Sequence, residues 1–155
     1  LDFNQPKSFT LSKNYPKMKI KLERIDQAYH MLATNENGNT VETDGSPQIG
    51  GGNKAMRPMQ MLIAALGGCS SIDVINLLEK MRQPLEDIKM EVNGERVEGE
   101  VPSLFTKINI HYLLYGDIDE SKAEKAIRLS VEKYCSVGLI VGKTAEITWS
   151  YEIIK

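Results

Sequence analysis

The sequence contains little cysteine, almost no net charge and no long uncharged hydrophobic run. Its 155 residues include only two cysteines, and 19 basic residues are set against 21 acidic ones, which gives a formal net charge of −2. Two cysteines are too few for a disulfide-stapled fold, and no Cys/His cluster has zinc-site spacing. A nearly neutral chain also has no basic field to attract nucleic acid or an anionic membrane surface.

The longest hydrophobic segment is too short for a membrane span. It lies within 57–80, and Asp73 interrupts it before it reaches the ~18 uncharged residues that a bilayer crossing needs. Residues 1–17 are polar and lack the apolar core of a signal peptide, so we interpret them as an N-terminal arm. We therefore expect a cytoplasmic protein that has neither a membrane nor a nucleic acid as partner.

Length and composition fit one globular domain, which we place at 18–155. Apolar residues make up 41% of the chain and charged residues 26%, as in ordinary globular proteins.

Sequence patterns predict several strands and one tight turn. Asn93-Gly94 is a favoured two-residue hairpin turn, which predicts a turn between two of these strands. Alternating apolar and polar residues predict strands at 18–25, 28–34, 40–43, 88–92, 96–101, 105–114 and 143–153.

Two segments have the 3.6-residue period of helices, 57–80 and 119–135. The resulting order is strands, a long helix, strands, a helix and a strand. Because strands and helices are segregated along the chain, the pattern predicts an α+β fold with mainly antiparallel sheets around a long central helix.

The central helix carries two adjacent glycines just before a cysteine. Each glycine costs a helix about 1 kcal/mol relative to alanine, so Gly67 and Gly68 indicate either tight helix–sheet packing or the close approach of another backbone or a ligand. The sequence leaves both open. The apolar stripe predicted to face the core consists of Leu62, Ala65, Leu66, Cys69, Ile72, Asn76 and Leu77.

The two cysteines permit redox chemistry without establishing it. Cys69 is in mid-helix, where cysteine is usually a small buried hydrophobe, whereas Cys135 closes the second helix. If the two helices pack with Cα atoms within about 7 Å, the pair could form a disulfide. A thiolate would then be oxidised to a sulfenic acid and condense with the second thiol. His30 and His111 have no evident acid partner, which disfavours a Cys–His hydrolase.

Two motifs resemble the OsmC/Ohr family of thiol peroxidases. The first is Ala64–Val74 (AALGGCSSIDV), and the second is Glu132–Val137 (EKYCSV), followed by Thr144–Trp149 (TAEITW). The resemblance implies an OsmC-like fold and an intertwined homodimer with active sites at the subunit interface. It also implies that Cys69 is the peroxidatic thiol and Cys135 the resolving thiol, that organic hydroperoxides are the substrates, and that a dithiol is the reductant. We expect no cofactor and no metal.

The sequence departs from the family beside the first cysteine. Family peroxidases carry a glutamate nine or ten residues before it, paired with an arginine that stabilises the thiolate. Met59 and Gln60 stand there in this chain, and a glutamine cannot hold an arginine by charge. The candidate arginine is Arg24, with Arg57 as the alternative.

Asp73 is four residues after Cys69, on the same helix face, where an unpaired carboxylate would oppose thiolate formation. The missing glutamate, with Met59 and Gln60 in its place, motivates a second hypothesis. In this alternative the chain is a catalytically weakened, dimeric hydrophobic-ligand binding protein of the same fold.

Overall fold

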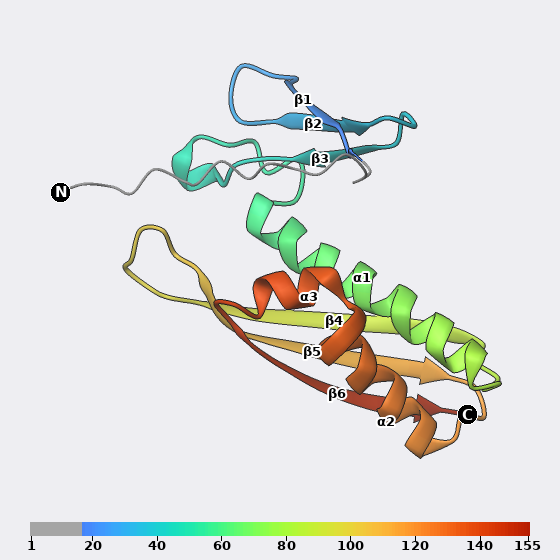
Figure 1. Cartoon of the computed structure of the whole chain (residues 1–155). Coiled ribbons are helices and arrows are strands. Elements are labelled where there is room, and N and C mark those ends of the chain that lie inside the picture. The colour runs from blue at the N-terminus through green and yellow to red at the C-terminus, as the bar shows by residue number, and fades with distance from the viewer. Residues whose placement is uncertain (1–16) are drawn as a thin grey trace. The chain divides into compact units, whose positions relative to one another are not determined.

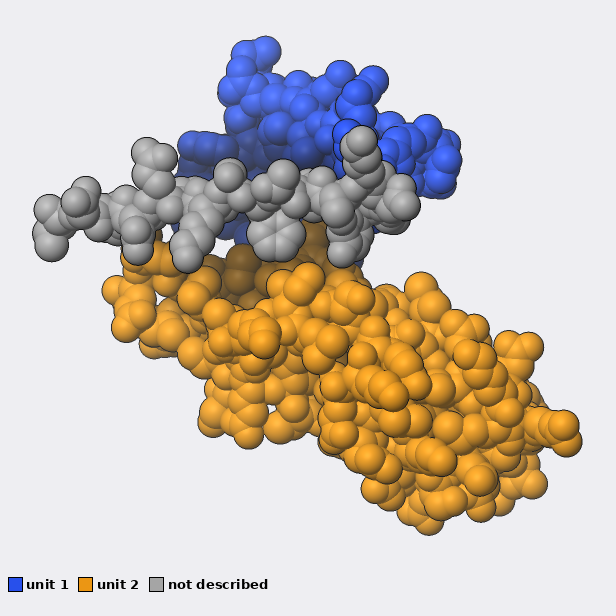
Figure 2. Space-filling model, in the orientation of Figure 1, with its two compact units in different colours: residues 1–57 blue, residues 58–155 orange. Residues whose placement is uncertain are grey.

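The computed structural model describes residues 17–155, and contacts between residues divide the chain into two compact units, Leu1–Arg57 and Pro58–Lys155 (Figure 2). The predicted arm over 1–17 lies outside the described residues, except for Lys17. The prediction of one domain over 18–155 stays a prediction.

The described part of the first unit is built on a three-stranded antiparallel sheet (Figure 1). The side-chain oxygen of Asn35 accepts hydrogen bonds from the backbone N–H groups of Asn37 and Asn39, and so holds the turn between the second and third strands. The strands, in sheet order, are β1 (Ile20–Arg24), β2 (Met31–Asn35) and β3 (Thr40–Thr43).

The loop after β3 is organised by one buried carboxylate. Asp44 is 2% exposed and accepts hydrogen bonds from the backbone N–H groups of Lys54, at 2.9 Å, and Gly45, at 2.7 Å. These bonds lower the pKa of Asp44 because they stabilise its charged form. The loop includes the 3-10 turn η1 (Pro47–Ile49), and it is therefore more ordered than its glycine content predicts.

The second unit packs its helices on one face of a three-stranded sheet ordered β4-β5-β6 (Figure 1). β4 and β5 are antiparallel, whereas β5 and β6 are parallel. The parallel pair differs from the predicted antiparallel sheets. The reason is the helical crossover between these strands, which returns the chain to the end where β5 starts. The elements are α1 (Pro58–Lys80), β4 (Asp87–Arg96), β5 (Phe105–Tyr115), α2 (Glu120–Leu129), the π-helical turn η2 (Ser130–Tyr134), α3 (Ser136–Val141) and β6 (Glu146–Ile154).

The side of α1 that is buried differs in part from the predicted stripe. Leu66 is buried as predicted, but Ile72 is 61% exposed, and Ala65 and Asn76 are also exposed. The buried residues of α1 are Leu66, Gly67, Ser70, Val74 and Leu78. Four of them are spaced four residues apart along one face of the helix. The sequence does not show this face as an apolar stripe, because Ser70 is polar.

The two glycines of α1 have different surroundings. A Cβ on Gly67 would lie 3.1 Å from Cγ2 of Val92 on β4, so Gly67 permits tight helix–sheet packing, one of the two alternatives above. A Cβ on Gly68 would meet nothing within 4 Å, and this residue is exposed next to Cys69.

The predicted hairpin turn at Asn93-Gly94 is wrong. Both residues lie within β4, which continues to Arg96, and the chain reverses instead through 97–104. The predicted strand over 96–101 is therefore absent. The glycine serves close packing, because a Cβ at Gly94 would lie 2.5 Å from Cε1 of Phe105.

The core of the second unit lies between the sheet and the helices. β5 contributes most, since its buried positions alternate along the strand, and each fully buried large apolar side chain stabilises the fold by about 1.5–3 kcal/mol. The buried apolar residues of β5 are Phe105, Ile108, Ile110, Tyr112 and Leu114.

Among residues 17–155, α1 is the one helix long and apolar enough to cross a bilayer by length and composition. Buried core helices of globular proteins also pass this test.

We expect Gly94→Ala to lower the free energy of unfolding by about 1–3 kcal/mol, because the new methyl group overpacks against a buried ring. Phe105 is 5% exposed and has little room to move away. Urea unfolding measures the change. Glu95→Ala, at the exposed neighbouring position, is the control and should stay within ~0.5 kcal/mol of the wild type. A Gly94→Ala protein as stable as the control would contradict the packing argument.

Candidate active site

Cys69 lies near the middle of α1 and is half-buried. Its neighbours Leu66 and Ser70 face the core, so the helix places the Cys69 side chain at the edge of the buried face. The residue is therefore held by a rigid element and stays partly exposed.

Cys135 lies where the second helical segment ends. Its backbone N–H donates to the carbonyl of Ser130, five residues earlier, which is the hydrogen bond of a π-helical turn. Its own backbone is extended, and its sulfur accepts a hydrogen bond from the N–H of Gly138 at 3.2 Å, which caps α3. The residue is completely buried.

The buried position of Cys135 keeps its thiol protonated. Burial, together with a hydrogen bond from Cys69, raises its pKa to about 12, and the Gly138 N–H only partly opposes this shift. At neutral pH, Cys135 is therefore a neutral thiol.

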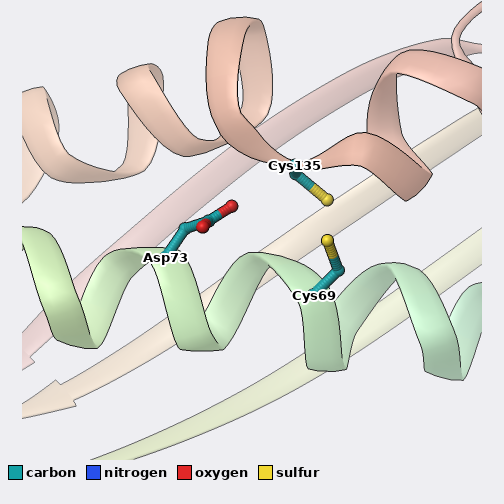
Figure 3. Close-up of side chains that lie close together, drawn as sticks. All are labelled: Cys69, Asp73 and Cys135. Carbon is teal, nitrogen blue, oxygen red and sulfur yellow. The ribbon is translucent and has the colours of Figure 1, made fainter. Parts of the chain in front are cut away.

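The structure brings the two cysteines together with one carboxylate (Figure 3). The sulfur atoms of Cys69 and Cys135 and a carboxylate oxygen of Asp73 all lie within 4.8 Å of one another, and both thiols are free. Cys69 and Asp73 come from adjacent turns of α1, whereas Cys135 faces them from the end of η2. The arrangement can form a disulfide or bind a cation.

A chain of buried hydroxyl groups leads to this cluster. Ser70 Oγ lies 2.6 Å from the hydroxyl of Tyr112 and 2.8 Å from Ser130 Oγ, so the chain joins α1, β5 and η2. Ser130 Oγ in turn contacts the carboxylate of Asp73 at 3.5 Å. Burial, partly offset by the bond to Ser70, raises the pKa of Tyr112 to about 12, so its hydroxyl stays protonated and can donate to Ser70.

The sequence itself places the chain among known proteins. Residues 51–150 match the family described as OsmC-like protein. The chain belongs to the OsmC-like family. Protein YhfA of Escherichia coli strain K12 is 42% identical over 124 residues, which are 79% of this chain and 89% of that protein.

Solved structures share the OsmC-like fold. A hypothetical protein from Aquifex aeolicus has a TM-score of 0.75 and 31% identity, over 91% of this chain and 100% of that one. An organic hydroperoxide resistance protein OsmC from Legionella pneumophila has a TM-score of 0.70 over 90% of this chain and 99% of that one, but only 14% identity, and so shows the fold alone.

Among the other predicted site residues of this OsmC-like chain, Gln60 lies in the second unit and does not join the cysteine cluster. Gln60 is exposed in the first turn of α1, nine residues and so roughly 13–14 Å along the helix axis from Cys69. Arg24 is an exposed residue at the end of β1, and Arg57 ends the first unit. The roles of Gln60 and of either arginine stay predictions.

Sequence reasoning missed the hydroxyl chain and the acid partners of both histidines. His30 Nε2 lies 2.7 Å from Glu42, and His111 lies 3.6 Å from Glu152. His30 lies just before β2 and Glu42 on β3, while His111 and Glu152 lie on β5 and β6, so both pairs form only when the sheets fold.

We expect the thiol of Cys135 to react slowly with iodoacetamide and to gain reactivity well above pH 9, because only the thiolate is nucleophilic and burial raises its pKa. The Cys69→Ser variant isolates this thiol, and Cys135→Ser provides the half-buried Cys69 for comparison. Mass spectrometry measures the extent of alkylation in each. In urea the two variants should react alike. Native Cys135 that is alkylated at neutral pH as fast as in urea would contradict the prediction.

We also expect Ser70→Ala to cost more stability than Tyr112→Phe. The first change leaves the buried hydroxyl of Tyr112 without its hydrogen-bond partner, at a cost of about 1–3 kcal/mol. The second change leaves Ser70 hydrogen-bonded to Ser130 and costs about 1 kcal/mol. Urea unfolding of both variants and of the double variant tests the coupling, which should make the double loss smaller than the sum. Additive losses would show that the hydroxyls do not act as a chain.

Proposed function

We propose that the chain is a thiol-dependent peroxidase that reduces organic hydroperoxides through Cys69 and Cys135. One observation carries the proposal: the two cysteines of the sequence lie far apart along the chain, yet their sulfur atoms lie within 4.8 Å of each other. In a protein with no other cysteine, such a pair is typical of reversible thiol oxidation. The family, and structural neighbours named as organic hydroperoxide resistance proteins, support the same chemistry.

The exposure of Cys69, and the burial and retained proton of Cys135, support different roles for the two thiols. Cys69 is half-buried and can meet a substrate, whereas Cys135 is fully buried and holds its proton. In the first step the Cys69 thiolate attacks the hydroperoxide, the O–O bond breaks, and the departing alkoxide takes a proton to become an alcohol. Cys69 is then a sulfenic acid.

In the second step Cys135 attacks the sulfur of that sulfenic acid. The S–S bond forms, and the sulfenic oxygen leaves as water with the proton of Cys135. A dithiol reductant then exchanges with the disulfide, becomes a disulfide itself and returns both cysteines to thiols. The sulfurs must approach from within 4.8 Å to about 2.05 Å, which side-chain rotation can largely provide.

We place this activity in a homodimer in the reducing cytoplasm. Exposed apolar residues on α1 and α3 support an interface in the second unit, since such surfaces are usually covered. The exposed apolar residues are Ile72, Ile75, Leu139 and Ile140.

In this proposal Arg24 supplies the cation that stabilises the Cys69 thiolate, and Gln60 takes the place of the family's glutamate.

A specific observation also favours the hydrophobic-ligand binding alternative. The carboxylate of Asp73 lies beside both sulfurs, and its charge helps to raise the pKa of the Cys135 thiol. If the site binds a lipid-like ligand without turnover, Cys69→Ser should bind it unchanged. The peroxidase assay below separates the two functions.

The expected result is that cumene hydroperoxide converts the reduced wild-type protein to a Cys69–Cys135 disulfide, which a dithiol reverses. Mass spectrometry of tryptic peptides identifies the bond, and consumption of reduced dithiol measures turnover against hydrogen peroxide as the second substrate. Cys69→Ser should lose turnover. Cys135→Ser is the matched variant and should accumulate a sulfenic acid on Cys69 that dimedone traps. Cys69 that stays unmodified after exposure to excess organic peroxide would contradict the proposal.

A further inference from the structure

We infer that Cys69, Asp73 and Cys135 form a binding site for a thiophilic divalent cation, and specifically for Zn²⁺. The inference concerns binding and does not require the peroxidase activity. It rests on the three donor atoms, on their neighbours and on the charge that the cluster would carry (Figure 3).

The donor atoms have the identity and spacing of a zinc site. Two sulfurs and one carboxylate oxygen lie within 4.8 Å of one another. In tetrahedral zinc coordination, bonds of about 2.0–2.3 Å place neighbouring ligand atoms roughly 3.5–4 Å apart. Atoms at that upper limit would therefore need to move closer by roughly 0.8–1.3 Å.

The backbone provides two of the donors from one rigid element. Cys69 and Asp73 are four residues apart on α1, so their side chains project from the same face of the helix one turn apart. Cys135 completes the triangle from the opposite side. Three protein ligands leave the fourth position of a zinc ion for water or another small ligand.

Hydrogen bonds already orient two of the three donors. The N–H of Gly138 donates to the sulfur of Cys135 at 3.2 Å, a bond that also stabilises a metal-bound thiolate. The hydroxyl of Ser130 contacts Asp73 at 3.5 Å and is itself held by Ser70 at 2.8 Å. Such neighbours fix ligand geometry before the ion arrives.

The charge of the cluster favours a cation. Within residues 17–155, the carboxylate of Asp73 has the long contact with Ser130 as its one hydrogen bond and takes part in no ion pair. Both neighbouring thiols add further negative charge when they ionise. A divalent cation would neutralise this charge and displace the thiol protons.

The sulfur donors select the metal. Mg²⁺ and Ca²⁺ take oxygen ligands almost entirely, whereas two thiolates with one carboxylate suit Zn²⁺ and its spectroscopic substitute Co²⁺. A bound ion would occupy both thiols, so Zn²⁺ should also slow the alkylation of Cys69.

Titration of the reduced, metal-free full chain with Co²⁺ under anaerobic conditions tests the site. We expect one Co²⁺ per chain, with thiolate-to-cobalt charge-transfer bands and the intense visible bands of tetrahedral cobalt, and displacement by Zn²⁺. Zn²⁺ should also protect Cys69 from iodoacetamide in the wild-type protein, a readout that needs no variant.

Variants then identify the ligands. Asp73→Asn should weaken Co²⁺ binding at least tenfold, while Glu79→Gln, an exposed acid on the same helix, should leave it unchanged. Cys69→Ser and Cys135→Ser should each reduce the charge-transfer bands, with circular dichroism as the check on folding. Absence of these bands in the wild type would overturn the inference, as would an Asp73→Asn variant that binds Co²⁺ as tightly as the wild type. Neither result would bear on the peroxide reaction, which is measured without metal.

Discussion

The hydrogen bond between Ser70 and Ser130 is the contact on which the arrangement of the cysteines depends. It joins α1 to the turn that precedes Cys135, and both side chains are completely buried. A buried hydroxyl that loses its hydrogen-bond partner destabilises the fold by about 1–3 kcal/mol. The pair therefore strongly favours one position of α1 along η2. A slip of one helical turn would carry Cys69 about 5.4 Å along the axis and out of reach of Cys135. An apolar contact at the same place would tolerate such a slip far better.

The π-helical turn makes the second half of the site possible. With its hydrogen bond five residues long, η2 ends so that Cys135 is completely buried, while the preceding Tyr134 is 47% exposed. The extended backbone at Cys135 then stops the helix and lets its sulfur cap α3. Irregular turns of this kind are frequent at functional sites because they redirect one side chain without disturbing the elements on either side.

The sequence predicts the fold class and the central helix well, since both depend on periodicity. It places α1 to within one residue, because Pro58 starts the helix and Gln83-Pro84 bars its extension. It fails where tertiary packing overrides a local signal. Asn93-Gly94 favours a turn in isolation, but the ring of Phe105 occupies the space beside Gly94 and the strand continues.

The site divides in the same way between local and tertiary signals. Family resemblance paired Cys69 with Cys135, and helical spacing placed Asp73 beside Cys69. The hydroxyl chain was not predictable, because Ser70, Tyr112 and Ser130 come from three elements whose contact no local pattern encodes. The parallel β5–β6 pair was within reach, however. The helix predicted over 119–135 between these strands is a crossover, and such a connection favours parallel strands.

Asp73 ties the two proposals to one electrostatic problem. The carboxylate is one of the charges that raise the pKa of Cys135, and full ionisation of both thiols beside it would put three negative charges within 4.8 Å. Disulfide formation removes that charge by joining the sulfurs, and a divalent cation removes it by binding them. These outcomes exclude each other, because a sulfur in a disulfide has lost the thiolate that zinc requires. The same three side chains therefore define a site whose occupancy by metal and whose oxidation must compete.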